Sequence, residues 1–155
     1  MDALDDAGIA FEIVPGITSA VAAAASIKVS LTRRGRNKSV RFITGQDMQG
    51  FAEHDWRSLS AVGSTAAIYM GVRAARFVQG RLLMHDADGE TPITVIENAS
   101  RSDQKIVATT LAGLPDALKD ANITGPAILF LGLAPREALA ATDTLPQSEA
   151  MKEAL

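Results

Sequence analysis

A β-hairpin in the second half of the chain constrains the fold more than any other feature of the sequence. The segments ITVIE (93–97) and KIVATT (105–110) are rich in β-branched residues, and the polar connector NASRSDQ (98–104) joins them. A connector this short requires antiparallel neighbours, because parallel strands need a crossover of a dozen or more residues. The sheet of this chain must therefore contain at least one antiparallel pair.

Outside the hairpin, the sequence alternates between strand and helix patterns. Helices are predicted for residues 2–8, AVAAAASI (20–27), RAARFVQGRLLM (73–84) and LPDALKDA (114–121), with a helical turn at DWRSL (55–59). Further strands are predicted for FEIV (11–14), SVRFIT (39–44), STAAIYM (64–70) and PAILFLG (126–132). This order predicts an α/β fold with a mixed β-sheet flanked by helices. In such open sheets, ligands bind outside the carboxyl ends of the strands.

Composition excludes several classes of function. The chain is 47% apolar and 21% charged, with a net charge of −3 and a pI near 5.3, so no basic surface predicts nucleic-acid binding. The absence of cysteine excludes thiolate metal sites and a cysteine nucleophile. His54 and His85 are isolated from each other and are predicted to be surface residues, so no metal site is expected. The apolar run AVAAAAS (20–26) is too short to cross a bilayer, and a cytoplasmic protein is predicted.

Four short segments carry groups suited to a ligand, and each also has a structural interpretation. VPGITSA (14–20) offers hydroxyls and backbone donors at a helix start, which suit a carboxylate or a ribose but also cap a helix. TRRGR (32–36) could clamp carboxylates or form a solvated loop. YMGV (69–72) could approach a ligand closely or belong to the core, and the connector NASRSDQ consists of ordinary turn formers.

Taken together in order and spacing, these segments resemble the tetrapyrrole methylases. The resemblance is carried by IAFEIVPGITSA, LTRR, SVRFITG, DW, AIYMG, TPITVIENASRSDQ and GPAILFLG, from about residue 5 to residue 133. Within the family, the pattern is most similar to that of the enzymes that methylate uroporphyrinogen III. The resemblance implies two α/β domains with S-adenosylmethionine bound between them, and S-adenosylhomocysteine as its product.

The resemblance also implies particular site residues. Cofactor contacts are expected from Thr18 and Ser19 at the methionine end, from Met70, Val72 and Ala99, and from Ala127 and Leu129 around the adenine. Substrate contacts are expected from Arg33 and Arg34, although arginine replaces the usual histidine at position 33. Ala99 replaces a frequent glycine, and its φ is more restricted than that of glycine. The resemblance implies no catalytic side chain, because the nucleophile is a carbon of the substrate.

The resemblance sets the expected domain organisation and function. Residues 1–16 match the end of a first methylase domain, residues 17–140 a second domain, and residues 141–155 a tail, so we expect part of a longer enzyme that is inactive alone. The expected reaction is methylation of uroporphyrinogen III at C2 and C7 to precorrin-2 by a homodimer, without nucleic-acid or membrane partners. Two alternatives stay open at this point: another precorrin methyltransferase, and a non-catalytic domain for ligand binding or dimerisation.

Overall fold

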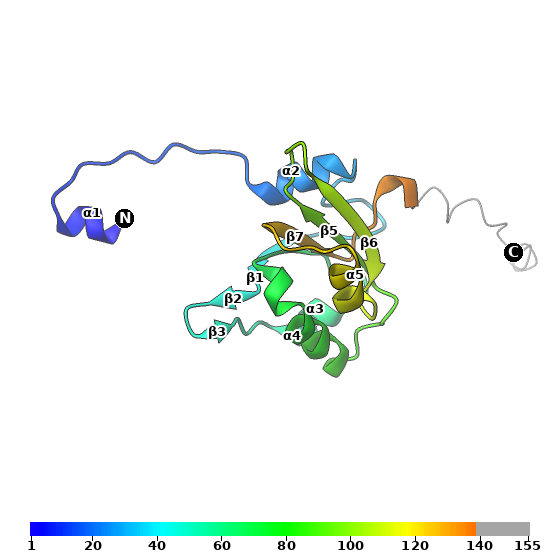
Figure 1. The fold of residues 1–155 in the computed structure, drawn as a ribbon. Helices are drawn as coiled ribbons and strands as arrows, with labels where there is room; N and C mark the ends of the chain where they lie inside the picture. The colour runs from blue at the N-terminus through cyan, green and yellow to red at the C-terminus, as the bar shows by residue number, and fades with distance from the viewer. Residues whose placement is uncertain (139–155) are drawn as a thin grey trace, which may run out of the picture.

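A five-stranded mixed sheet forms the centre of the computed structural model, which describes residues 1–138 (Figure 1). Its strands stand in the order β1-β4-β7-β5-β6. They are β1 (Arg41–Thr44), β4 (Ala66–Tyr69), β7 (Ala127–Leu131), β5 (Pro92–Glu97) and β6 (Lys105–Thr110). β1 and β4 are parallel, and every other neighbouring pair is antiparallel. The predicted mixed α/β sheet and its β5–β6 hairpin are therefore confirmed.

Helices cover both faces of this sheet, because successive residues of a strand point to opposite faces and the central strands β4, β5 and β7 are buried almost continuously. The helices are α2 (Ser19–Ser26), α3 (Trp56–Ser60), α4 (Gly71–Met84) and α5 (Leu114–Asp120). In β7, Leu129 and Leu131 belong to the apolar cluster under α3, α4 and α5, whereas Ile128 and Phe130 belong to the cluster under α2. β7 thus reads as a continuous apolar run because both of its faces are buried.

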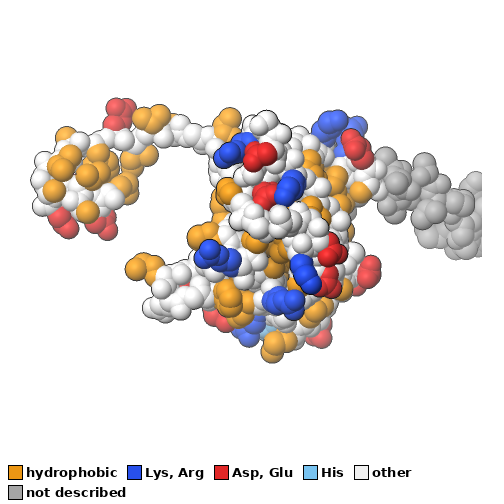
Figure 2. Space-filling view, viewed as in Figure 1, with side chains coloured by type: hydrophobic (Ala, Val, Ile, Leu, Met, Phe, Trp, Pro, Cys, Tyr) orange, Lys and Arg blue, Asp and Glu red, His pale blue; other side chains and the backbone are white. Residues whose placement is uncertain are grey.

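The amino-terminal segment differs from the sequence prediction. A short helix, α1 (Asp2–Asp6), is followed by an extended segment that holds it away from the body (Figure 1). We call residues 1–17 the arm; all of them are exposed, and Figure 2 shows its apolar side chains without cover. The prediction of a strand at 11–14 is wrong for this structure, because no described strand lies beside it to accept and donate the ladder hydrogen bonds.

A small two-stranded hairpin was not anticipated from the sequence. It pairs β2 (Gln46–Asp47) with β3 (Gly50–Phe51) immediately after β1. Of the expected domain boundaries, the tail at 141–155 and the last two residues of the 17–140 domain lie outside the described residues. Among residues 1–138, no helix is long and apolar enough to cross a membrane.

Candidate functional site

A cavity of about 480 Å³ lies at one edge of the central sheet. β1, β4 and β5 run in one direction and β7 in the other, so three carboxyl ends and the start of β7 meet at this edge. The lining residues come from all of these places and from the start of α2. They are Ser19, Gln46, Tyr69, Met70, Val72, Arg73, Ile96, Asn98, Ala99, Arg101, Thr124, Gly125, Pro126, Ala127 and Ile128. The cavity therefore lies where an open α/β sheet places its ligand.

The junction between β4 and α4 presents Met70 to the cavity. Met70 has a left-handed backbone (φ 51°), which turns the chain sharply from strand to helix. The turn packs tightly: a Cβ on Gly45 would lie 2.9 Å from the carbonyl oxygen of Met70, and one on Gly71 would lie 3.0 Å from Leu129. Met70 lines the cavity and is 57% exposed.

The Tyr69 hydroxyl group fixes the start of α2 beside this junction. It forms a hydrogen bond with the Thr18 side chain, and the backbone amide of Ala20 donates to it over 3.2 Å. Burial acts to raise the pKa of Tyr69, but the hydrogen bonds from Thr18, Ala20 and Ser19 together outweigh it and lower that pKa. Ser19 is thereby held at the cavity.

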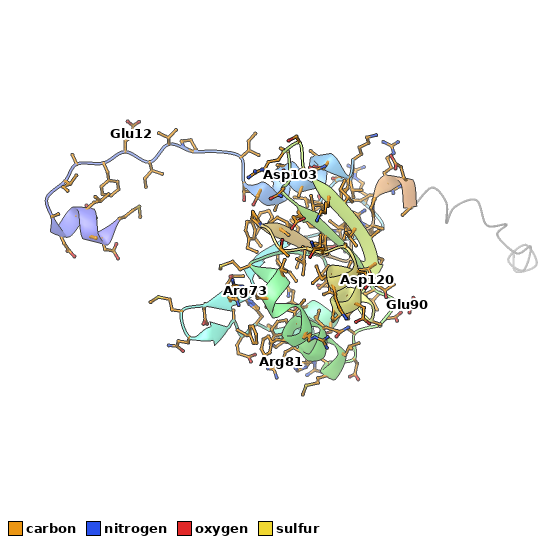
Figure 3. The ribbon with its side chains drawn as sticks, viewed as in Figure 1. Glu12, Arg73, Arg81, Glu90, Asp103 and Asp120 are labelled. Carbon is orange, nitrogen blue, oxygen red and sulfur yellow. The ribbon has the colours of Figure 1, made fainter. Side chains whose placement is uncertain are left out.

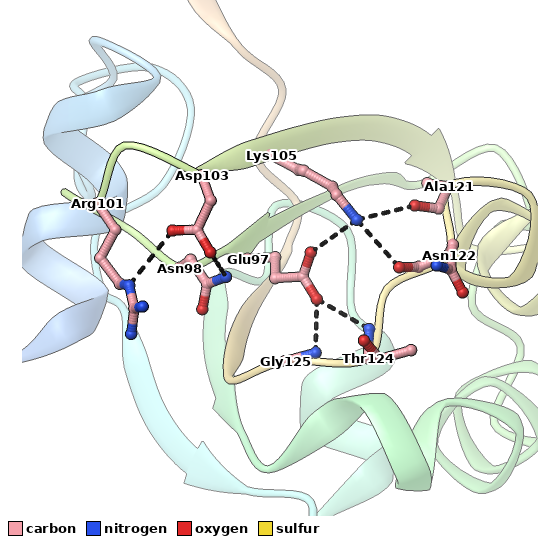
Figure 4. A network of polar contacts seen from close by, with 9 residues as sticks. All are labelled: Glu97, Asn98, Arg101, Asp103, Lys105, Ala121, Asn122, Thr124 and Gly125. Atoms are coloured by element: carbon pink, nitrogen blue, oxygen red, sulfur yellow. Dashed lines mark hydrogen bonds and ion pairs between the residues drawn. The ribbon is translucent and has the colours of Figure 1, made fainter.

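The connector between β5 and β6 forms a third wall, and two of its residues have left-handed backbones. These are Asn98 (φ 52°) and Ser100 (φ 68°). Gln104 ties the connector to α2, because its Oε1 accepts hydrogen bonds from the Ser100 amide and the Ser26 hydroxyl, each over 2.9 Å. The Asn98 side chain in turn donates to Asp103 over 2.8 Å (Figure 4).

A buried carboxylate supports the fourth wall, which is the segment between α5 and β7 (Figure 4). Glu97 is 3% exposed, and its Oε1 accepts the amides of Thr124 (2.8 Å) and Gly125 (2.5 Å). Its Oε2 lies 3.1 Å from the Lys105 ammonium. The Gly125 amide is the main influence that lowers the pKa of Glu97, with the Thr124 amide and Lys105 adding to it against the effect of burial.

The structure brings together five of the seven residues predicted to contact a cofactor. Ser19, Met70, Val72, Ala99 and Ala127 all line the cavity. The other two lie one layer behind it.

Thr18 contacts the lining residue Tyr69, and Leu129 is fully buried against Gly71. Their roles toward a ligand stay predictions. The same holds for Arg33 and Arg34, which the structure places in the loop after α2 and not among the cavity's lining residues.

Several lining residues were not predicted, and two of them are cations. Arg73 lies on the first turn of α4, directly after YMGV, and Arg101 lies in the connector (Figure 3 labels Arg73). Arg101 is paired with Asp103 at 3.3 Å, whereas none of the ion pairs within residues 1–138 involves Arg73. The described lining contains no acidic residue, so this cavity favours an anionic group although the chain is negative overall.

The fold and the cavity define a class of protein: an α/β domain with a largely apolar pocket that also offers a few backbone and hydroxyl groups and two arginines. Such a pocket suits a nucleoside-like ligand that carries a carboxylate. The family described as Tetrapyrrole (Corrin/Porphyrin) Methylases matches residues 1–115. The chain belongs to this family.

Known relatives and solved structures agree with this assignment. The chain is 36% identical over 122 residues to a siroheme synthase of Pseudoalteromonas translucida, covering 79% of this chain and 26% of that protein. It is 38% identical over 132 residues to siroheme synthase 1 of Klebsiella pneumoniae, covering 85% of this chain and 28% of that protein. The chain therefore spans about a quarter of the length of these relatives.

Two solved structures have the same fold over most of the chain. A cobalt precorrin-4 methyltransferase superimposes with a TM-score of 0.75 at 28% identity, covering 84% of this chain and 55% of that one. The uroporphyrin-III C-methyltransferase of Thermus thermophilus, complexed with S-adenosylhomocysteine, superimposes with a TM-score of 0.68 at 27% identity. The match covers 83% of this chain and 55% of that one.

Proposed function

We propose that the cavity is one side of an S-adenosylmethionine site, and that the whole protein methylates uroporphyrinogen III at C2 and C7 to give precorrin-2. The observation that carries the proposal is the convergence of Ser19, Met70, Val72, Ala99 and Ala127 on one cavity from distant parts of the sequence. The similarity to a uroporphyrin-III C-methyltransferase complexed with S-adenosylhomocysteine supports the same ligand.

The chemistry of the lining fits this cofactor. Val72, Ile96 and Ile128 offer apolar surface for a nucleoside. Ser19 offers a hydroxyl, and the positive charges of Arg73 and Arg101 suit the carboxylates of an amino acid or a tetrapyrrole.

S-adenosylmethionine would supply an electrophilic methyl group, and the electron-rich ring carbon of the substrate would supply the nucleophile. The task of this chain is then to orient the cofactor and to exclude water around it, for which rigid apolar walls are suited. The walls are rigid here because the Tyr69, Gln104 and Glu97 side chains each tie two separate segments together.

Calorimetric titration of the 155-residue chain with S-adenosylhomocysteine tests the proposal. We expect micromolar binding that Met70→Ala weakens, because Met70 presents its side chain at the cavity. Met84→Ala is the matched control, since Met84 is an exposed methionine at the far end of α4. Equal loss in both variants, or no heat from a folded chain, would count against a preformed site in this chain.

A second candidate function is methylation of a later precorrin. It is favoured by the TM-score of 0.75 to the cobalt precorrin-4 methyltransferase. The products of the full-length protein decide between the two candidates. Uroporphyrinogen III converted to a dimethylated product supports the first, and turnover only of a precorrin that is already methylated supports the second.

A further inference from the structure

We propose that Glu97 and Lys105 together position the segment 121–126 and thereby set the shape of the cavity wall formed by Thr124–Ala127. We call this residue pair the clamp. The inference deepens the proposed function and rests on it for the identity of the ligand. The clamp does not itself line the cavity, so both side chains are positioning residues.

The sheet register places the clamp at a fixed point. Glu97 is the last residue of β5 and Lys105 is the first residue of β6, and the two face each other as a cross-strand pair. Glu97 is also paired with Ala127, the first residue of β7. The clamp therefore stands on two adjacent strands, β5 and β6, directly beside the point where the segment 121–126 enters β7.

The two charges of the clamp bind complementary groups of that segment's backbone (Figure 4). The carboxylate accepts the amides of Thr124 and Gly125, while the ammonium donates to the carbonyls of Ala121 (3.3 Å) and Asn122 (3.0 Å). Hydrogen bonds to charged groups are the stronger kind. The carboxylate is nearly fully buried, so its position is fixed by packing as well as by these bonds.

The segment is shaped to receive the clamp. A Cβ on Gly125 would lie 3.1 Å from the Glu97 carboxylate, so glycine permits the close approach. Asn122 has a left-handed backbone (φ 48°), a conformation that asparagine tolerates but that needs support from its surroundings. Residues Thr124 to Ala127 also line the cavity. A displaced segment would therefore change the cavity directly.

The clamp acts on one end of the cavity only. By the family resemblance, Ala127 lies at the adenine end of the ligand, whereas Ser19 and Thr18 lie at its methionine end. Loss of the clamp should therefore weaken the binding of the adenosine part. Loss of the Tyr69 hydroxyl, which fixes Thr18 and the start of α2, should weaken the binding of the amino-acid part.

Titration with two ligands separates these effects. S-adenosylhomocysteine has both ends, whereas 5′-methylthioadenosine lacks the amino-acid end. Because the clamp bonds are charge-assisted, we expect Glu97→Ala to weaken the binding of both ligands by about tenfold or more. Glu97→Gln still offers an acceptor to the two amides, so its affinity for both ligands should lie between that of Glu97→Ala and that of the wild type. Tyr69→Phe should weaken only S-adenosylhomocysteine, and the exposed Glu90→Gln should change neither.

Amide hydrogen exchange supplies a second readout that needs no ligand. We expect the Thr124 and Gly125 amides to exchange faster in both Glu97 variants, with the core strands still protected. If the wild-type chain binds neither ligand, the proposed site fails for this chain, and amide exchange alone decides whether the clamp holds the segment. Unchanged exchange at both amides overturns the inference, as does a Glu97→Gln variant that loses affinity only for S-adenosylhomocysteine.

Discussion

Several residues around the cavity have left-handed backbone conformations. Met70 and Asn98 line it, Ser100 lies in the connector, and Asn122 lies in the clamped segment. Conformations of this kind cost of order 1–3 kcal/mol for residues other than glycine, and they persist where the surrounding structure enforces them. Methionine is the least suited of these residues to positive φ, so its presence at position 70 indicates that the side chain has a task outside folding.

Met70→Gly tests this interpretation. Glycine relieves the backbone strain, and little packing is lost because the methionine side chain is more than half exposed. We expect the free energy of unfolding to rise by up to about 1 kcal/mol, while affinity for S-adenosylhomocysteine falls. Urea denaturation and calorimetry measure the two quantities. A large loss of stability would instead show that Met70 is a packing residue.

Gly132 is a glycine that the fold requires, in contrast to Gly80. Its φ is 75°, and a Cβ there would lie 2.2 Å from the Ser64 carbonyl oxygen, whereas a Cβ on Gly80 would meet nothing within 4 Å. Gly132→Ala should lower the free energy of unfolding by about 2 kcal/mol or more. Gly80→Ala, within α4, should raise it by about 0.5–1 kcal/mol. Chemical denaturation compares the two variants, and equal effects would contradict the assigned backbone conformations.

Glu97 should make stability depend on pH. Its pKa in the folded chain lies below the ordinary value of 4.5, so the stabilisation is complete above that value and is lost as the pH falls through the lower, folded-state pKa. As the pH falls below 4.5, the free energy of unfolding should therefore decrease less steeply in Glu97→Gln than in the wild type. Part of the slope should survive, because the pKa of Glu53 is also lowered. The check is the denaturation midpoint of the wild type and of Glu97→Gln, measured at several pH values in this range. Parallel pH dependence in the two proteins would contradict the assignment.

At the scale of whole elements, the sequence predicted most of the sheet and its helices. β5, β6 and β7 were predictable because apolar and β-branched runs end at turn formers, and α4 because its apolar residues recur at helical spacing. The strand predicted at 11–14 had the right composition, but strand formation depends on a partner that composition does not reveal. The short β2–β3 hairpin has two residues per strand, which is too few for a pattern.

Part of the cavity was also predictable from the sequence. Met70 and Ala99 follow strand ends, and strand ends meet at one edge of the sheet. The family resemblance places Arg33 and Arg34 near the substrate, and that stays a prediction. The cations that line the cavity are Arg73 and Arg101. Which loop reaches the edge is set by the strand order, and the strand order places β7 between β4 and β5 in a way that no local pattern encodes.

Gln104 attaches the connector to α2 through its side-chain hydrogen bonds, and a substitution can test this attachment. Gln104→Ala removes both hydrogen bonds at its Oε1 and leaves the Ser100 amide without this acceptor. We expect the free energy of unfolding to fall by about 1–2 kcal/mol and the Ser100 amide to exchange faster. Ser102→Ala is the matched control, because this exposed residue lies in the same connector. Similar losses in the two variants would show that Gln104 does not link the elements.

At the scale of the whole molecule, the arm adds surface without adding core. Residues 1–17 are all exposed, and they include Phe11, Ile13 and Val14. Removing residues 1–16 should leave the free energy of unfolding within about 0.5 kcal/mol of the wild type, as for surface changes in general. It should also reduce self-association in sedimentation velocity, because exposed apolar surface promotes it. A marked loss of stability would show that the arm packs on the body.

The position of β7 has a consequence for how the protein is made. This strand is the last of the sheet in sequence but pairs with both β4 and β5, so it joins the β1–β4 pair to the β5–β6 hairpin. During synthesis at about 5–20 residues per second, the two halves of the sheet emerge from the ribosome with their inner edges unpaired. They stay so until residue 131 has left the exit tunnel. A nascent chain stalled before β7 should therefore be a strong substrate for chaperones, and one stalled well beyond it should not.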